Sequence, residues 1–211
     1  AQLSRGLGDV YKRQDLQLNR FKNKYSNIEL RTYREKDSEF FLEKLSDEKT
    51  MQHLEYMSKD WTLEKVKNRY QRFELWQSEG KAMNSSILYD NKLVGHCGLL
   101  NMDFKHRHAS FGTIIHHPFW RNGIALVSRY LYFTHAFEVL KLNRISSGTR
   151  ENNYGVRSFY EKHGIELESI EKQKFFSDGK FCDNYCYAIL AHQWPAVKKS
   201  FELELAQKQL S

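Results

Sequence analysis

The chain has 211 residues, of which 40% are hydrophobic, so it is long enough to bury one core of ordinary domain size. Its formal net charge of +7 favours anionic partners, but the charges are scattered and form no recognisable DNA- or RNA-binding motif. No apolar run approaches the length of about 18 residues that a membrane helix needs, and no signal peptide is seen. We therefore expect no membrane partner and no sequence-specific nucleic-acid partner. The three cysteines fit no disulfide framework and favour a reducing, cytoplasmic setting.

The first 14 residues show neither helical nor strand periodicity. Their fragment DVYKRQ resembles translated sequencing-adaptor read-through, so residues 1–14 are interpreted as a non-native or disordered tail. Residues 15–27 then form an N-terminal extension. Residues 28–194 form the folded domain, and residues 195–211 form a C-terminal helix or tail.

The folded domain is predicted to begin with a short strand over residues 28–33, where apolar and polar residues alternate. A helix over residues 35–48 has Asp37 as its cap, and a second helix over residues 60–80 ends at Gly80. Apolar residues recur every three or four positions in both helices. They are Phe40, Phe41 and Leu45 in the first helix, and Leu63, Val66, Tyr70, Phe73 and Trp76 in the second.

Beyond Gly80, stretches typical of strands alternate with helical ones. The predicted strands are residues 84–103 (two strands around an Asp90–Asn91 turn), 108–118, 143–150, 165–176 and 181–194. The predicted helices are residues 121–140, 152–164 and 195–210, the last with Val197, Phe201 and Leu205 on one face. This order predicts an α/β (α+β) fold with a single mixed, mostly antiparallel sheet and helices on both faces.

The junction HHPFWRNGIALVS, residues 116–128, is the first feature that points to a ligand. A helix starting near Asn122 leaves its first amide N–H groups unpaired, and its dipole adds about half a positive charge there. Gly123 lets an anion approach the backbone and Arg121 adds a permanent positive charge. The junction can therefore bind a pyrophosphate, although a purely structural turn fits the same residues.

The blocks around this junction resemble the Gcn5-related N-acetyltransferase (GNAT) superfamily, in particular its RimJ/RimL-type and spermidine-acetyltransferase-type branch. The resemblance runs through WRNGIA, LKLNRI, ENNYGVRSFYEKHGIE and FFSDGKFCDNYCYAI, and covers residues 28–194. It implies the GNAT acyl-CoA N-acyltransferase fold for this domain and acetyl-CoA as the co-substrate, with no metal. It also implies direct transfer of the acetyl group to a primary amine in a ternary complex.

The first matching block resembles the family's phosphate loop, often written Q/R-x-x-G-x-G/A. Gly123 and Ala125 match the last two specified positions of this motif, and Trp120 stands where Gln or Arg is usual. The resemblance implies that the pantetheine arm pairs with the end of the preceding strand, near Ile115 and His116. The backbone amides that would hold the cofactor phosphates are those of Arg121, Asn122, Gly123, Ile124 and Ala125.

The second block resembles N-x-x-[S/A]-x-x-x-Y-x-K-x-G-F, with departures at two positions, Val156 and Ile165. The resemblance implies that Asn153 contacts the cofactor and that Tyr160 protonates the leaving coenzyme A thiolate. A phenol suits this role because it can donate one proton to sulfur. The structural alternatives are a core aromatic for Tyr160 and a helix cap for Asn153.

Many GNAT enzymes carry a glutamate base on the strand before the phosphate loop, and in this chain Ser110 occupies that position. Three substitutes stay open: His116, which shares strand parity with Ser110, Glu55, and bulk water. Imidazole titrates near neutrality, which favours His116. Packing within a strand is the alternative for His116, and an ordinary surface charge is the alternative for Glu55.

The missing glutamate bears on the acceptor, because an amine attacks only when it is neutral. Deprotonation at pH 7 costs roughly 4–5 kcal/mol for a polyamine nitrogen but only about 1 kcal/mol for a peptide α-amine. The charge of +7 also repels polyamines. These arguments favour a peptide or protein N-terminus, of the ribosomal-protein type. Spermidine-like polyamines, amino sugars and a catalytically silent acetyl-CoA-binding module are the alternatives.

The remaining conspicuous side chains have simpler interpretations. The histidines and cysteines have no closed zinc-site spacing, so we expect no metal and buried, inert thiols. The segment FFSDGKF is predicted to be a hairpin turn with aromatic flanks, or a wall of the acceptor site. The oligomeric state is open, with a homodimer as one alternative.

Overall fold

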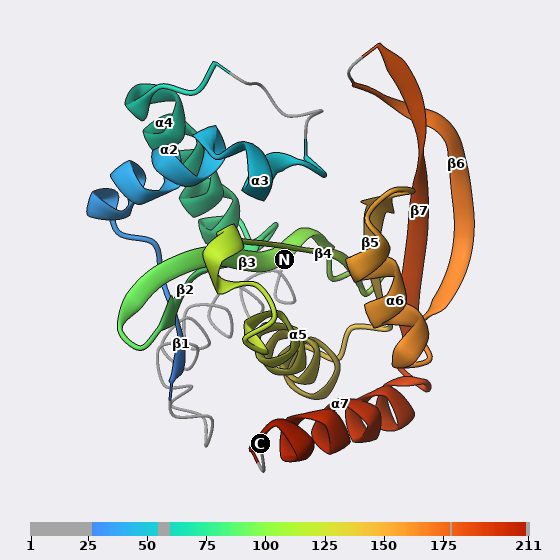
Figure 1. Ribbon diagram of the computed structural model, residues 1–211. Helices are drawn as coiled ribbons and strands as arrows, with labels where there is room; N and C mark the ends of the chain where they lie inside the picture. Colours follow the sequence, from blue (N-terminus) through green and yellow to red (C-terminus); the bar gives the residue numbers. More distant parts are fainter. Residues whose placement is uncertain (1–26, 55–59, 178, 210–211) are drawn as a thin grey trace.

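Seven strands form one sheet in the computed structural model, which describes residues 27–54, 60–177 and 179–209 (Figure 1). The strand order is β1-β2-β3-β4-β5-β7-β6, and only β4 and β5 run parallel to each other. This confirms the predicted mixed, mostly antiparallel sheet. The strands are β1 (Ile28–Arg31), β2 (Met83–Tyr89), β3 (Lys92–Asp103), β4 (His108–Ile115), β5 (Arg144–Arg150), β6 (Glu166–Ser177) and β7 (Lys180–Leu190).

Helices cover both faces of the sheet, as expected (Figure 1). The N-terminal helices α2, α3 and α4 cover one face, and α5, α6 and α7 cover the other. They are α2 (Ser38–Ser46), α3 (Glu48–Met51), α4 (Leu63–Ser78), α5 (Ile124–Thr134), α6 (Tyr154–Lys162) and α7 (Trp194–Gln209), with short helical turns η1 (Glu35–Asp37), η2 (His117–Phe119) and η3 (His135–Val139). None of the described helices is long and apolar enough to cross a membrane.

The apolar periodicity of the sequence explains most of the packing. The larger core cluster surrounds α5, and α7 packs on it through Val197, Phe201 and Leu205, which are buried as predicted. A second cluster lies between α2 and α4 and contains most of the predicted apolar positions there. Trp76, at the end of the α4 stripe, is instead 36% exposed.

Two predicted helices differ from the observed ones. The helix expected over residues 35–48 is broken, because η1 precedes α2 and a separate helix, α3, follows Asp47. Asp37 does not cap α2 with its side chain. Its carboxylate instead accepts hydrogen bonds from the Arg31 guanidinium at 2.7 and 2.8 Å and from the Ser86 hydroxyl at 3.1 Å. The apolar helix expected over residues 121–140 begins only at Ile124 and becomes a π-helix at His135.

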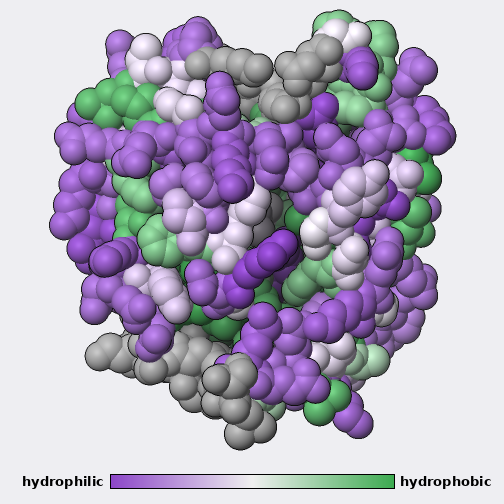
Figure 2. Space-filling view, viewed as in Figure 1, coloured by the Kyte–Doolittle hydropathy of each residue, from purple (hydrophilic) through white to green (hydrophobic). Residues whose placement is uncertain are grey.

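The pairing of β4 with β5 is the feature of the sheet that positions the site. It covers only three residue pairs and ends at Ser110 and Ser146. Beyond that pair β4 continues to Ile115 and β5 to Arg150, without pairing to each other. Figure 2 shows this side of the molecule covered mainly by hydrophilic residues and hollowed near its centre, where hydrophobic residues come into view.

Candidate active site

The unpaired edge of β4 is the first element of the candidate site. The amide of His116 donates to the carbonyl of Val94 at 2.8 Å, which fixes the hydrogen-bond phase between β3 and β4. Because antiparallel strands alternate their bonding direction, Phe111, Thr113 and Ile115 direct their backbone groups away from β3. They face the side where β5 has ended its pairing, so this edge can pair with an extended ligand.

The structure separates the two residues predicted to pair with the pantetheine arm. The Ile115 carbonyl accepts the Trp120 indole N–H at 2.7 Å, while the Ile115 amide faces the open edge. Both backbone groups of His116 are engaged, because its amide donates to Val94 and its carbonyl accepts from Phe119 at 3.0 Å. Ile115 is therefore placed for such pairing, whereas the His116 backbone is not.

The loop before α5 forms a cradle of amides. Within the part of the chain that the structure describes, the amides of residues 121–125 donate to no backbone carbonyl, and the first helical bond runs from Val127 to Gly123 at 3.0 Å. Arg121 and Gly123 both have positive φ, of 67° and 75°. Successive amides in such a turn converge on one point, which suits an anion. All five residues predicted to bind the phosphates thus lie together.

The end of α7 lies beside this cradle, which the sequence did not indicate. Helix α7 runs antiparallel to α5, since Trp194 stacks on Phe137 with 5.5 Å between ring centroids and Lys208 reaches the start of α5. The Cδ atom of Lys208 lies 3.6 Å from the position that a Cβ atom would occupy on Gly123. A cationic side chain from the last turn of the chain therefore borders the loop.

Tyr160 lies on α6 and is only 1% exposed, with its ring 4.7 Å from the ring of Tyr187. Its hydroxyl has no hydrogen-bond partner among the residues that the structure describes. A buried hydroxyl without a partner loses its hydrogen bonds to water and gains none in the fold, which costs free energy. A ligand atom at this position would supply a partner. Asn153 caps the same helix by accepting the Val156 amide at 3.3 Å, which confirms the cap considered for it.

The residues proposed as the base do not gather at one place. The Ser110 hydroxyl lies 3.4 Å from that of Ser146, at the last β4–β5 pair. His116 follows six residues later, which along an extended strand is about 20 Å. Its ring packs edge-on against Phe40 at 5.8 Å. The structure therefore does not bring His116 to the Ser110 position, and Glu55 lies outside the described residues.

His116 belongs instead to a small polar cluster that the sequence did not reveal. Asp47 caps α3 by accepting the Thr50 amide at 2.7 Å, and its Oδ2 lies 2.9 Å from Nδ1 of His117 and 3.9 Å from Nε2 of His116. Partial burial opposes the ionisation of Asp47, but hydrogen bonds from Thr50 and His117 bring its pKa down to about 2. These three donors could hold a divalent cation. In the fold they attach the start of the phosphate loop to α3.

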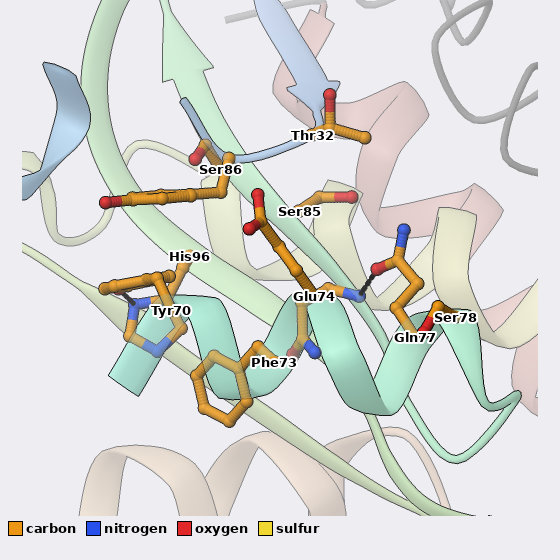
Figure 3. Close-up of a pocket in the computed structure, with 11 residues that line it drawn as sticks. Thr32, Tyr70, Phe73, Glu74, Gln77, Ser78, Ser85, Ser86 and His96 are labelled. Atoms are coloured by element: carbon orange, nitrogen blue, oxygen red, sulfur yellow. Dashed lines mark hydrogen bonds between the residues drawn. The ribbon is translucent and has the colours of Figure 1, made fainter. Parts of the chain in front are cut away.

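A cavity of about 280 Å³ lies on the same face as α4, between that helix and β2 (Figure 3). Figure 3 shows Tyr70 and His96 at one end, and Gln77 accepting the backbone amide of Asn84 at 3.1 Å. The residues that line the cavity come from the segment after β1 and from α4, β2 and β3, and none of the residues assigned to the candidate active site is among them.

The β6–β7 hairpin confirms the predicted turn with aromatic flanks. Phe176 and Phe181 near its tip are exposed, with ring centroids 4.9 Å apart. Glu171 in the hairpin accepts a hydrogen bond from Asn184 at 2.6 Å. Cys186 is only partly buried, contrary to the expectation of three buried thiols. Whether the hairpin walls an acceptor site stays a prediction.

Comparison with known proteins shows the family to which the chain belongs. The family model described as "Acetyltransferase (GNAT) domain" matches residues 27–166. YdaF of Bacillus subtilis (strain 168), which carries the name of a ribosomal N-acetyltransferase, is 29% identical over 126 residues. These residues are 58% of this chain and 69% of YdaF. The spermidine N(1)-acetyltransferase of Escherichia coli (strain K12) is 26% identical over 111 residues, which are 53% of this chain and 60% of that protein.

Solved structures show the same fold. The spermidine N-acetyltransferase from Vibrio cholerae, in complex with CoA and spermine, has a TM-score of 0.72 and 19% identity, covering 81% of this chain and 99% of that chain. RimL, a ribosomal L7/L12 α-N-protein acetyltransferase in complex with coenzyme A, has a TM-score of 0.69 and 20% identity, covering 78% of this chain and 94% of that chain.

The unpaired β4 edge, the free amides of the loop and the unpartnered Tyr160 hydroxyl suit an extended, phosphate-bearing thioester. Together with the matching family model, these features give the chain its identity: it belongs to the acetyltransferase (GNAT) domain family and is an N-acetyltransferase that uses acetyl-CoA as its co-substrate.

Proposed function

We propose that this chain transfers the acetyl group to the α-amine of a peptide or protein N-terminus, by direct attack of the amine on the thioester. The observation that carries the proposal is Ser110, whose hydroxyl faces Ser146 at 3.4 Å where many relatives hold a carboxylate base. A peptide α-amine has a pKa of about 7.8, so an appreciable fraction is already neutral at pH 7. It needs the weakest base of the acceptors considered.

Each element of the site then has a role. The amides of residues 121–125 bind the phosphates, and the β4 edge at Phe111, Thr113 and Ile115 pairs with the pantetheine arm. The Tyr160 hydroxyl donates its proton to the leaving sulfur. Asn153 acts by capping α6 and so fixes the helix that carries Tyr160.

Water accepts the proton of the amine in this proposal. His116 lies about 20 Å along β4 from Ser110, too far to accept that proton directly. Glu55 is the remaining side chain from the sequence, and a Glu55→Gln variant tests it. Loss of transfer in that variant would replace water by Glu55 as the base.

A polyamine acceptor is the second candidate, and the distribution of charge favours it. Residues 1–26 contain six Lys or Arg but only two Asp or Glu, so the folded domain repels a polyamine less than the total of +7 suggests. The Escherichia coli relative at 26% identity is named a spermidine N(1)-acetyltransferase. Amino sugars, and a module that binds acetyl-CoA without catalysis, are further alternatives.

The deciding experiment measures thiol release from acetyl-CoA with the full chain and three acceptor sets. These are peptides with free N-termini, the same peptides with blocked N-termini and an internal lysine, and spermidine. Turnover that requires a free N-terminus supports the proposal. Faster turnover with spermidine would establish the polyamine alternative. Binding of acetyl-CoA without any turnover would indicate the silent module.

A further inference from the structure

Arg129 is a buried cation that the roles above do not use. It lies on α5 and is only 4% exposed. Its Nη1 donates to the Ala125 carbonyl one turn earlier, at 3.2 Å, whereas its Nε has no hydrogen-bond partner. Among the residues that the structure describes, no carboxylate forms an ion pair with it. A permanent charge is therefore buried without a counter-charge.

The surroundings of Arg129 are three aromatic rings at the point where β4 and β5 separate. Its Cζ lies 4.7 Å from the ring centroid of Phe159, 5.6 Å from that of Tyr160 and 5.8 Å from that of Phe111. Phe111 directly follows Ser110, the last residue of β4 that pairs with β5. The guanidinium, whose Nε has no hydrogen-bond partner, thus lies beside the ring of Tyr160, whose hydroxyl also has none among the described residues.

None of the titratable groups described around Arg129 forms an ion pair with it. On β3, burial raises the pKa of the Cys97 thiol, which keeps it neutral. At His163, which directly follows α6, burial lowers the pKa although Glu204 opposes the effect. Glu204 on α7 is itself held by Lys162 and His163, each at 2.9 Å. Cation–π contacts compensate part of the lost hydration, but a buried charge normally needs a partner.

We propose that Arg129 is the counter-charge for the thiolate that coenzyme A becomes when the acetyl group leaves. The proposal rests on the acetyl transfer described above. The amine nitrogen forms a bond to the carbonyl carbon, the C–S bond breaks, and its electron pair stays on sulfur. The sulfur then takes the proton of Tyr160, the amine gives its proton to water, and the phenolate regains a proton from solvent.

Arg129 acts on the interval between bond cleavage and protonation. During that interval the sulfur carries a full negative charge, which a fixed, buried cation nearby stabilises. In the absence of coenzyme A the same buried cation lowers the stability of the folded chain. This predicts that a neutral residue of similar size lowers turnover without lowering stability, since replacing a buried charge by an apolar group is often neutral or stabilising.

The test measures the thiol pKa of bound coenzyme A through the ultraviolet absorbance of its thiolate. It compares the parent chain with Arg129→Met, which removes the charge, and Arg129→Lys, which keeps it. We expect the pKa of the bound thiol to be about 1–2 units higher in Arg129→Met than in the parent, with Arg129→Lys close to the parent. Turnover of Arg129→Met should fall about 10- to 100-fold at an unchanged KM for the amine.

Desulfo-coenzyme A provides the matched control, because it lacks the sulfur and should bind the parent and both variants within about twofold. An equal bound-thiol pKa in the parent and Arg129→Met would overturn the proposal. So would a loss of desulfo-coenzyme A affinity in parallel with turnover, since that would indicate a role in folding. If Arg129→Met does not fold, the comparison between the parent and Arg129→Gln decides in the same way. A shift in thiol pKa without acetylation of any N-terminus would support Arg129 and reject the proposed acceptor.

Discussion

The Nζ atom of Lys44 lies 2.7 Å from Nδ1 of His96, in the interior between α2 and β3. The Tyr70 hydroxyl approaches the same nitrogen at 3.1 Å. Burial lowers the pKa of both Lys44 and His96 well below their usual values. The nearby charge of Arg69 adds to this effect on both residues, and Lys44 adds to it on His96. Folding therefore disfavours the charged form of the Lys44 amine. Its neighbours Tyr70 and His96 line the cavity of Figure 3.

This pair predicts that Lys44→Met stabilises the protein. The pKa of Lys44 in the folded chain lies below its ordinary value of 10.5, so the unfolded chain binds a proton there more readily and the parent loses stability as the pH falls below that value. The variant removes this loss. Urea unfolding at about pH 7 should give a gain of about 1–4 kcal/mol, and the rise in stability of the parent towards pH 10 should flatten.

Lys36→Met, at an exposed position of η1, is the control and should change stability by less than about 0.5 kcal/mol. A Lys44→Met variant that is less stable than the parent, with an unchanged dependence on pH, would contradict a lowered pKa of Lys44. It would indicate that the amine is charged and has a partner.

Local patterns predicted the elements of the fold because their causes are local. The Asp90–Asn91 turn was visible from residue types that tolerate positive φ, and both residues adopt it, at 49° and 62°. The buried face of α7 was visible from the spacing of three apolar residues. The loop at Gly123 was recognisable because its chemistry is contained in a few consecutive amides.

The parts that the sequence did not predict depend on partners far along the chain. Asp37 looked like a helix cap, but Arg31 and Ser86 from neighbouring strands bind its carboxylate. Asp47 gave no signal because its partner His117 is 70 residues away. The chemistry of imidazole favoured His116 among the candidate bases, but neither that chemistry nor strand parity gives its distance from Ser110 along the strand. Arg129 gave no signal in the sequence, because two of the rings that it contacts, Phe159 and Tyr160, come from a different helix, α6.

The amide cradle predicts that Gly123→Asp weakens the binding of acetyl-CoA at least tenfold. The substitution places a side chain at a φ of 75° and a negative charge beside the phosphates, and both effects oppose binding. Isothermal titration of acetyl-CoA measures the change. Gly179→Asp is the matched control, because Gly179 has the same φ of 75° in the β6–β7 turn. Equal losses of affinity in the two variants would show that backbone strain, and not the cradle, is responsible.

The unpartnered hydroxyl of Tyr160 predicts a loss of turnover without a loss of binding. Tyr160→Phe should lower kcat about 100-fold or more, since acid catalysis of this kind is worth roughly 10²–10⁴. Its Kd for acetyl-CoA and its thermal stability should stay near those of the parent, because the hydroxyl makes no hydrogen bond in the fold. Tyr187→Phe, at the ring 4.7 Å away, is the control and should keep most of the activity. Unchanged kcat in Tyr160→Phe would leave the residue a core aromatic only.

The position of His116 predicts that its imidazole is dispensable for proton transfer. His116→Gln should change kcat by less than about threefold and leave the pH profile of kcat/KM in place, because the ring lies about 20 Å along β4 from Ser110. The KM for acetyl-CoA should rise instead, since the ring packs on Phe40 and approaches Asp47 next to the start of the phosphate loop. Initial rates at saturating N-terminal peptide, measured across neutral pH, separate the two effects. A large fall in kcat together with loss of the limb of the pH profile that reports the base would restore His116 as the base, and it would require the acceptor amine to enter from the end of β4.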